Sequence, residues 1–221
     1  MRDYITEKVK DTPRFFMFGG IEVYEKDPLS LDIDLRAFLA SIEELFPEHF
    51  FKGLKGIVIG DKKDFKERSV NAMYKDGVFY ITNQQDNLKD LMDDLVHEFA
   101  HHVEMLFPED LYSDEKLKKE FLKKRKQLEF ELRSEGYWTS EYDFSNLKFS
   151  QDFDNFLYKR VGKNMLRLVT AALFIRPYGA ISLREYWATG FEAYFMGQRD
   201  ELQRISPDLY SKIENLVSAP F

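Results

Sequence analysis

Apolar residues recur at helical spacing between residues 86 and 107. They stand three or four positions apart, at Leu88, Leu91, Met92, Leu95, Val96, Phe99, Val103 and Leu106. Residues at this spacing share one face of an α-helix. Asp86 or Asn87 is suited to cap the start of such a helix, and Pro108 cannot continue it. The pattern predicts an amphipathic helix whose core face is this apolar stripe.

The same spacing predicts helices in the remainder of the chain. They are expected between Ser30 and Pro47, over 113–135, over about 151–161 and 164–174 with a break near Gly162, and after Ser182. The helix over 113–135 carries a basic run, which consists of Lys118, Lys119, Lys123, Lys124, Arg125 and Lys126. Charged runs of this kind usually lie on a solvated helix face, and we expect the same of the basic run.

Strand patterns are confined to the first half of the chain. Residues 21–24 alternate between apolar and polar, and residues 56–61 contain a short apolar run between glycines. Residues 72–82 read as a β-hairpin with Asp76 and Gly77 at its turn. The order predicts an α+β fold, mostly α. We expect one domain over 1–221, with an N-terminal lobe over about 1–108 and a helical C-terminal lobe over about 109–221.

Within the 86–107 helix lies His97-Glu98-x-x-His101, the spacing typical of zinc hydrolases. At about 100° per residue, His97 and His101 point together to the side away from the apolar stripe, with Glu104 beside them. Two imidazoles so placed can bind one Zn²⁺, and Glu98 then stands beside the open position of the metal. His102 points into the apolar stripe and is expected in the core or behind the ligands.

The third zinc ligand must come from a carboxylate. The chain has no Cys, and no His follows His102. The best stretch is residues 182–195, where Glu185 and Glu192 fall on one helical face. Either could bind the metal. Glu185 also stands three residues after Ser182, which is a helix-capping pattern.

HExxH followed by Glu on a later helix resembles the gluzincin metallopeptidases. Within that group, residues 177–191 resemble the anthrax lethal factor-like catalytic domain and similar small zincins, in which a Tyr precedes a turn and a Glu-aromatic-aromatic-Ala-Glu run. The resemblance implies a zincin-like fold, with a small sheet and hairpin on the HExxH helix. It also implies that Glu185 is the third ligand and that Tyr178 takes part in catalysis.

The chain departs from that pattern at one position. Thr189 stands where the family has a second Glu, which supports the site from behind the ligands. Asp94, Thr189 and Glu192 are the alternatives for this supporting role. The departure also keeps open a second interpretation, that of a catalytically inactive zincin-fold structural or binding protein.

The resemblance implies a zinc-dependent peptidase, with an endopeptidase as the default. Glu98 would take a proton from the zinc-bound water and pass it to the leaving amine. Tyr178 would donate a hydrogen bond to the oxyanion. The expected partner is a peptide or protein substrate, and the hairpin at 72–82 could pair with an extended one.

The composition and net charge of the chain disfavour some classes of binding partner. The 221 residues are 44% hydrophobic and 16% aromatic, with a net charge of −7 and a pI near 5.3. This charge disfavours nucleic acid, for which the basic run would be the only candidate surface, and it disfavours an anionic membrane. Without a signal-peptide pattern, a transmembrane-length apolar run or Cys, the sequence suits a cytoplasmic protein. The resemblance to small zincins adds a virion-associated protein as the other expectation. The sequence gives no indication of the oligomeric state.

Overall fold

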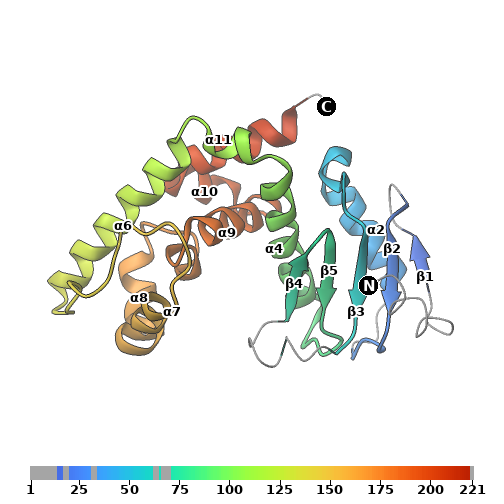
Figure 1. The fold of residues 1–221 in the computed structure, drawn as a ribbon, viewed down its shortest axis with the longest axis horizontal. Coiled ribbons are helices and arrows are strands. Elements are labelled where there is room, and N and C mark those ends of the chain that lie inside the picture. The colour runs from blue at the N-terminus through green and yellow to red at the C-terminus, as the bar shows by residue number, and fades with distance from the viewer. Residues whose placement is uncertain (1–13, 17–19, 31–33, 62–64, 66–70, 220–221) are drawn as a thin grey trace. The chain divides into compact units, whose positions relative to one another are not determined.

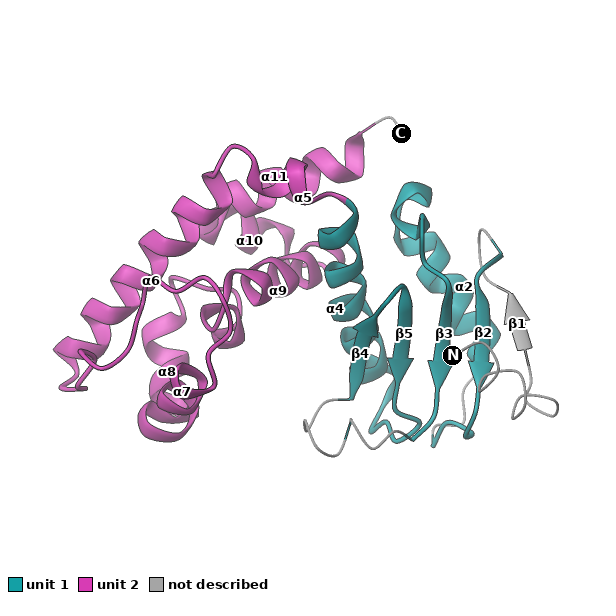
Figure 2. Ribbon diagram, in the orientation of Figure 1, with its two compact units in different colours: residues 1–106, 221 teal, residues 107–220 magenta. Residues whose placement is uncertain are grey.

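The computed structural model describes residues 14–16, 20–30, 34–61, 65 and 71–219. The first thirteen residues, which bear on the signal-peptide expectation, and residues 31–33 of the first expected helix lie outside these ranges. The chain divides into two compact units, residues 1–106 with 221 and residues 107–220 (Figure 2). The α+β class with a majority of helix is confirmed for the described residues.

A five-stranded sheet forms the frame of unit 1 (Figure 1). Its strands are β1 (Arg14–Phe16), β2 (Glu22–Glu25), β3 (Gly56–Ile59), β4 (Ala72–Lys75) and β5 (Val78–Ile81). The spatial order is β1-β2-β3-β5-β4. The three inner strands run parallel, whereas β1 and β4 are antiparallel to their neighbours. The edge strand β4 therefore presents one side of its backbone away from the sheet.

The expected hairpin is confirmed as β4 and β5. Lys75 pairs with Val78 across a two-residue turn. Asp76 and Gly77 there have φ of 55° and 86°. Positive φ at both turn residues is what a type I′ turn requires, and Asp-Gly is among the pairs that adopt it.

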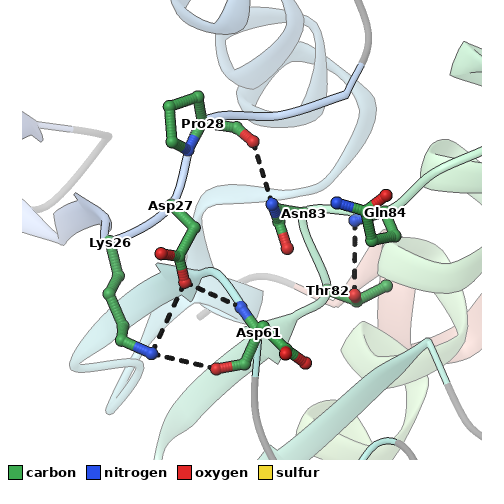
Figure 3. A network of polar contacts seen from close by, with 7 residues as sticks. All are labelled: Lys26, Asp27, Pro28, Asp61, Thr82, Asn83 and Gln84. Carbon is green, nitrogen blue, oxygen red and sulfur yellow. Dashed lines mark hydrogen bonds and ion pairs between the residues drawn. The ribbon is translucent and has the colours of Figure 1, made fainter.

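Polar contacts tie the carboxyl ends of the parallel strands together (Figure 3). Asp61 follows β3 and Asp27 follows β2. The backbone amide of Asp61 donates to Oδ2 of Asp27 at 3.0 Å. Lys26 Nζ donates to the Asp61 carbonyl at 3.0 Å. The side-chain amide Nδ2 of Asn83, which follows β5, donates to the Pro28 carbonyl at 3.0 Å. These contacts fix the strand ends where three connecting segments begin.

Helix α4 (Leu88–Leu106) packs on the hairpin. It follows α2 (Leu35–Leu45) and the short 3₁₀ helix η2 (Glu48–Phe51) in the described chain. The Phe99 ring stacks on Phe46 at 4.2 Å between centroids, meets Phe51 edge-on and lies tilted against Phe79. The predicted apolar stripe of α4 thus faces the core from Leu91 onward, whereas its first member, Leu88, is exposed. The opposite face of the helix carries the HExxH polar residues.

Unit 2 is helical. Its elements are α5 (Pro108–Tyr112), α6 (Lys116–Ser134), α7 (Gln151–Asn155), the π-helical η3 (Phe156–Gly162), α8 (Lys163–Thr170), the 3₁₀ helix η4 (Pro177–Ala180), α9 (Leu183–Phe195), α10 (Arg199–Ile205) and α11 (Pro207–Ser218). The expected break at Gly162 is confirmed, but the following helix ends at Thr170 rather than near residue 174. Of the helices described, none is long and apolar enough to cross a membrane.

The basic run on α6 is not wholly solvated, so that expectation is wrong for two of its members. Lys124 is 8% exposed and Arg125 is 1% exposed. Arg125 lies in the apolar stripe of α6, between Phe121 and Leu128, both of which are buried. Main-chain carbonyls accept hydrogen bonds from both cations, which is what allows them to be buried.

Candidate metal centre

Helix α4 places the two histidines as the sequence predicts. Its start is capped by Asn87, whose Oδ1 accepts from the Asp90 amide at 2.9 Å. One turn separates His97 from His101, and their ring centroids lie 4.8 Å apart. His97 is half-buried and His101 is buried. The two imidazoles therefore lie next to each other and are largely shielded from solvent.

Glu104 lies against His101, on the same side of the helix. Its Oε2 is 3.7 Å from His101 Nδ1. A carboxylate near one ring nitrogen is the usual way to fix the tautomer of a metal-binding histidine and leave the other nitrogen for the metal. At 3.7 Å the Glu104–His101 contact is longer than a hydrogen bond, so it does not by itself fix the tautomer of His101.

Among the described residues, one group of three could hold a metal ion: His97, His101 and Glu185. Each offers one ligand atom, and these atoms lie within 4.8 Å of one another. Two neutral imidazoles and one carboxylate are a donor set that zinc accepts in catalytic sites. Glu192 is not part of this group.

Glu98 is held by the edge strand β4. The Tyr74 amide donates to Glu98 Oε2 over 2.6 Å. Asn71 O accepts from Thr82 N, so in the alternating antiparallel ladder Tyr74 stands opposite Phe79 without hydrogen bonds between them. The Tyr74 amide thus points to the outer side of β4, and the Glu98 carboxylate lies at that edge.

Asp94 lies one turn before His97 on α4. Burial raises its pKa to about 6, although hydrogen bonds from Gln85 and Asn71 and the proximity of His97 act in the opposite direction. Of the three candidates for the supporting role, Asp94 is thus the one whose charge interacts with a predicted ligand within unit 1. The sequence alone left it as one alternative of three.

His102 belongs to the core, as its position in the stripe predicts. It is fully buried, between the rings of Phe79 and Phe99, and its Nδ1 is 2.9 Å from the Tyr74 hydroxyl. Burial lowers the pKa of His102 to about 4, although hydrogen bonds to the backbone of Phe50 and Lys52 act in the opposite direction. The ring is therefore neutral in the folded protein at neutral pH.

This burial predicts a pH-dependent stability. Between about pH 6.5 and 4 the unfolded chain binds a proton at His102 that the folded chain does not, so stability is full above that window and falls on acidification. The loss from His102 is expected to reach about 2 kcal/mol at pH 5. Asp94 acts in the opposite direction, because its raised pKa favours the folded state in acid.

The two effects are separated by comparing wild type with His102→Gln in the metal-free protein. Urea unfolding at pH 7.5 and pH 5 gives the change in the free energy of unfolding for each. We expect the wild type to lose about 2 kcal/mol more than the variant. Equal losses in both proteins would show that His102 is not buried in its neutral form.

In unit 2, Glu185 occupies the first turn of α9. Ser182 caps this helix, and its Oγ accepts from the Glu185 amide at 3.1 Å. The capping pattern is thus formed through the Glu185 backbone and does not use the half-buried carboxylate. Both interpretations of Glu185 from the sequence are compatible for this reason.

Glu192 has an ion-pair partner, which argues against it as the third ligand. Its side chain is 4% exposed, and Oε2 is 2.6 Å from Arg176 Nη1. Arg176 immediately precedes η4, the segment that carries Tyr178. The Glu192–Arg176 pair therefore anchors η4 to α9, and the Tyr178 side chain remains 40% exposed.

Thr189, where the gluzincin resemblance would place a second Glu, is a packing residue. Its hydroxyl donates to the Glu185 carbonyl at 2.8 Å. Gly179 of η4 approaches it so closely that a Cβ built there would lie 2.6 Å from Thr189 Oγ1. A Glu at position 189 would need space that η4 occupies. Thr189 itself therefore does not supply a supporting acid.

This close approach predicts a compensating pair. Gly179→Ala is expected to destabilise the protein by about 1–3 kcal/mol, because η4 must move away from α9. Adding Thr189→Ala removes the oxygen that the new methyl group meets and should recover most of that loss. Thermal or urea unfolding of the two single variants and the double variant measures both steps. A double variant as unstable as the sum of its parts would contradict the packing described.

Comparison with known proteins gives no relatives. No protein-family model matches the chain, and no curated protein or solved structure matches it either.

Proposed function

We propose that the chain is a zinc-dependent metallopeptidase of the gluzincin type with a zincin-like fold. His97, His101 and Glu185 are the zinc ligands. The observation that carries the proposal is this donor set, with one ligand atom from each within 4.8 Å, beside a carboxylate of suitable placement, Glu98. A structural zinc site has no use for a base next to its ligands.

When bound, zinc supplies Lewis acid chemistry, which polarises the scissile carbonyl and acidifies water. Glu98 is the base. It takes a proton from the attacking water as the new C–O bond forms, and gives it to the leaving amine as the C–N bond breaks. The hydrogen bond from the Tyr74 amide holds Oε2 of Glu98 and orients the carboxylate for this transfer.

Tyr178 is the proposed hydrogen-bond donor to the reacting carbonyl. Its hydroxyl would donate a hydrogen bond to the oxyanion that forms at the carbonyl. Its 40% exposure, on a segment anchored to α9 at both Arg176 and Gly179, supports a role toward substrate rather than in the core. Glu185 lies in the first turn of α9, the helix to which this segment is anchored.

The proposed substrate is an extended peptide. The outer side of β4 carries backbone groups that do not pair with β5, and one of them, the Tyr74 amide, already donates to Glu98 at this edge. A peptide that adds to an edge strand is held by main-chain hydrogen bonds, with limited dependence on its sequence. An internal bond is the default site of cleavage.

The test is cleavage of a peptide library by the zinc-loaded protein, with products identified by mass spectrometry. Cleavage that stops with a chelator and returns with zinc supports the proposal. The second candidate is an inactive zincin-fold binding protein, which Thr189 in place of the family's second Glu favours. Zinc binding without any cleavage in the library would select that candidate.

A further inference from the structure

Arg125 is a buried cation whose partners in the structure are main-chain carbonyls. Its Nη1 donates to the carbonyl of Ala180 at 2.7 Å and more weakly to that of Ile181 at 3.4 Å. Its Nη2 donates to the carbonyl of Asp143 at 3.1 Å. The Phe153 ring covers the guanidinium, with 3.9 Å between its centroid and Cζ.

A cation in such a place is unfavourable unless its contacts are specific. Taking an ion out of water costs several kcal/mol. Among the described residues, the charge of Asp143 offsets part of the effect of burial, which still lowers the pKa of Arg125 to about 10. The position lies in the apolar stripe of α6, where Leu or Met would pack without that cost. What only the guanidinium supplies is a rigid fork of donors that can hold several carbonyls at once.

Two of the three carbonyls that Arg125 holds belong to one short segment. Ala180 is the last residue of η4 and Ile181 precedes the cap of α9. Tyr178 lies just before these carbonyls and Glu185 just after them. The spacing between these two side chains depends on the conformation of the few residues that Arg125 clamps.

We infer that Arg125 is a positioning residue of the proposed active site. By holding the Ala180 and Ile181 carbonyls, its guanidinium fixes Tyr178 against the helix that carries Glu185. The inference rests on the proposed function, which gives Tyr178 and Glu185 their roles. It adds a residue from α6 that touches neither substrate nor metal.

The neighbouring residue provides a matched control. Lys124 is also a buried cation on α6, and its Nζ donates to the carbonyls of Leu173 and Ile205, both at 2.7 Å. Neither carbonyl belongs to the segment between Tyr178 and Glu185. Loss of Lys124 therefore removes a comparable buried cation without releasing η4.

The kinetic experiment is a double-mutant cycle on peptide cleavage by the zinc-loaded protein. Arg125→Met should lower kcat about 10- to 100-fold, the cost of misplacing a reacting group by about 1 Å, and leave KM nearly unchanged. In the Tyr178→Phe background the same change should cost almost nothing. Lys124→Met should keep kcat within about twofold of wild type. An equal loss of kcat in both backgrounds would overturn the inference.

Arg125→Lys covers the case in which the Met variant fails to fold. It keeps the charge but has no fork, so it should retain one carbonyl contact and lose kcat to a smaller degree. Full wild-type kcat in Arg125→Lys would count against the inference, since a point charge would then suffice.

A second measurement does not depend on activity. The Gly179 and Ile181 amides donate to the carbonyls of Arg176 and Tyr178 within η4. In Arg125→Lys, hydrogen exchange at these amides should speed up at least about tenfold, with Lys124→Met within about twofold of wild type. If the wild type cleaves nothing, the proposed function fails, while this exchange still decides whether Arg125 clamps the segment. Unchanged exchange in Arg125→Lys would show that it does not.

Discussion

Glu98→Gln is expected to lower kcat for peptide cleavage by about 10²- to 10⁴-fold, with zinc still bound. The amide oxygen of Gln can accept the Tyr74 N–H as Glu98 does now, so the side chain keeps its place. It has no basic oxygen, however, and cannot take the proton from the attacking water. Steady-state kinetics together with zinc content on the same preparation give both quantities.

The control for this variant is Glu135→Gln, which changes an exposed carboxylate at the end of α6. It goes through the same purification and should cleave as the wild type does. Unchanged cleavage in Glu98→Gln would mean that Glu98 is not the base or that a contaminating protease is responsible. A loss of zinc along with activity would leave Glu98 with a role in binding the metal instead.

Zinc is expected to stabilise the folded protein by about 4 kcal/mol when its free concentration is about 1,000 times Kd. A ligand that binds the folded state alone shifts unfolding by mass action, and the ligands of this site are brought together only by folding. The response should be absent in His97→Ala. Urea unfolding with and without zinc, followed by circular dichroism, measures the shift.

His102→Gln is the matched control, because it removes a histidine from the same helix whose ring lies in the core. Its zinc response should equal that of the wild type, even though its overall stability differs. A zinc response that survives in His97→Ala and disappears in His102→Gln would place the metal elsewhere on α4.

The elements around the candidate site were predictable because their signals are local. The stripe of α4 sets which side faces the core, so the shared direction of His97 and His101 follows from spacing alone. The Asp76-Gly77 turn follows from the φ angles that these residues tolerate. The cap at Ser182 needs only the residue three positions later.

What the sequence did not predict depends on contacts between distant segments. Arg125 looked like part of a solvated basic run, and only its place between Phe121 and Leu128 in the stripe hinted at burial. The hydrogen bond from Tyr74 to Glu98 and the approach of Gly179 to Thr189 leave no periodic signal. Helical periodicity alone left both Glu185 and Glu192 as candidate ligands, because they lie on one helical face, and the resemblance favoured Glu185. The ion pair with Arg176 now argues against Glu192.

Bound zinc per chain, measured by elemental analysis after zinc loading and removal of excess metal, tests the central claim most directly. The account predicts one zinc per chain in wild type and in Glu192→Gln, weaker retention in Glu185→Gln, and none in His97→Ala. Glu192→Gln is matched to Glu185→Gln in chemistry and in helix face. A wild type without zinc would contradict the account, and so would zinc lost in Glu192→Gln but kept in Glu185→Gln.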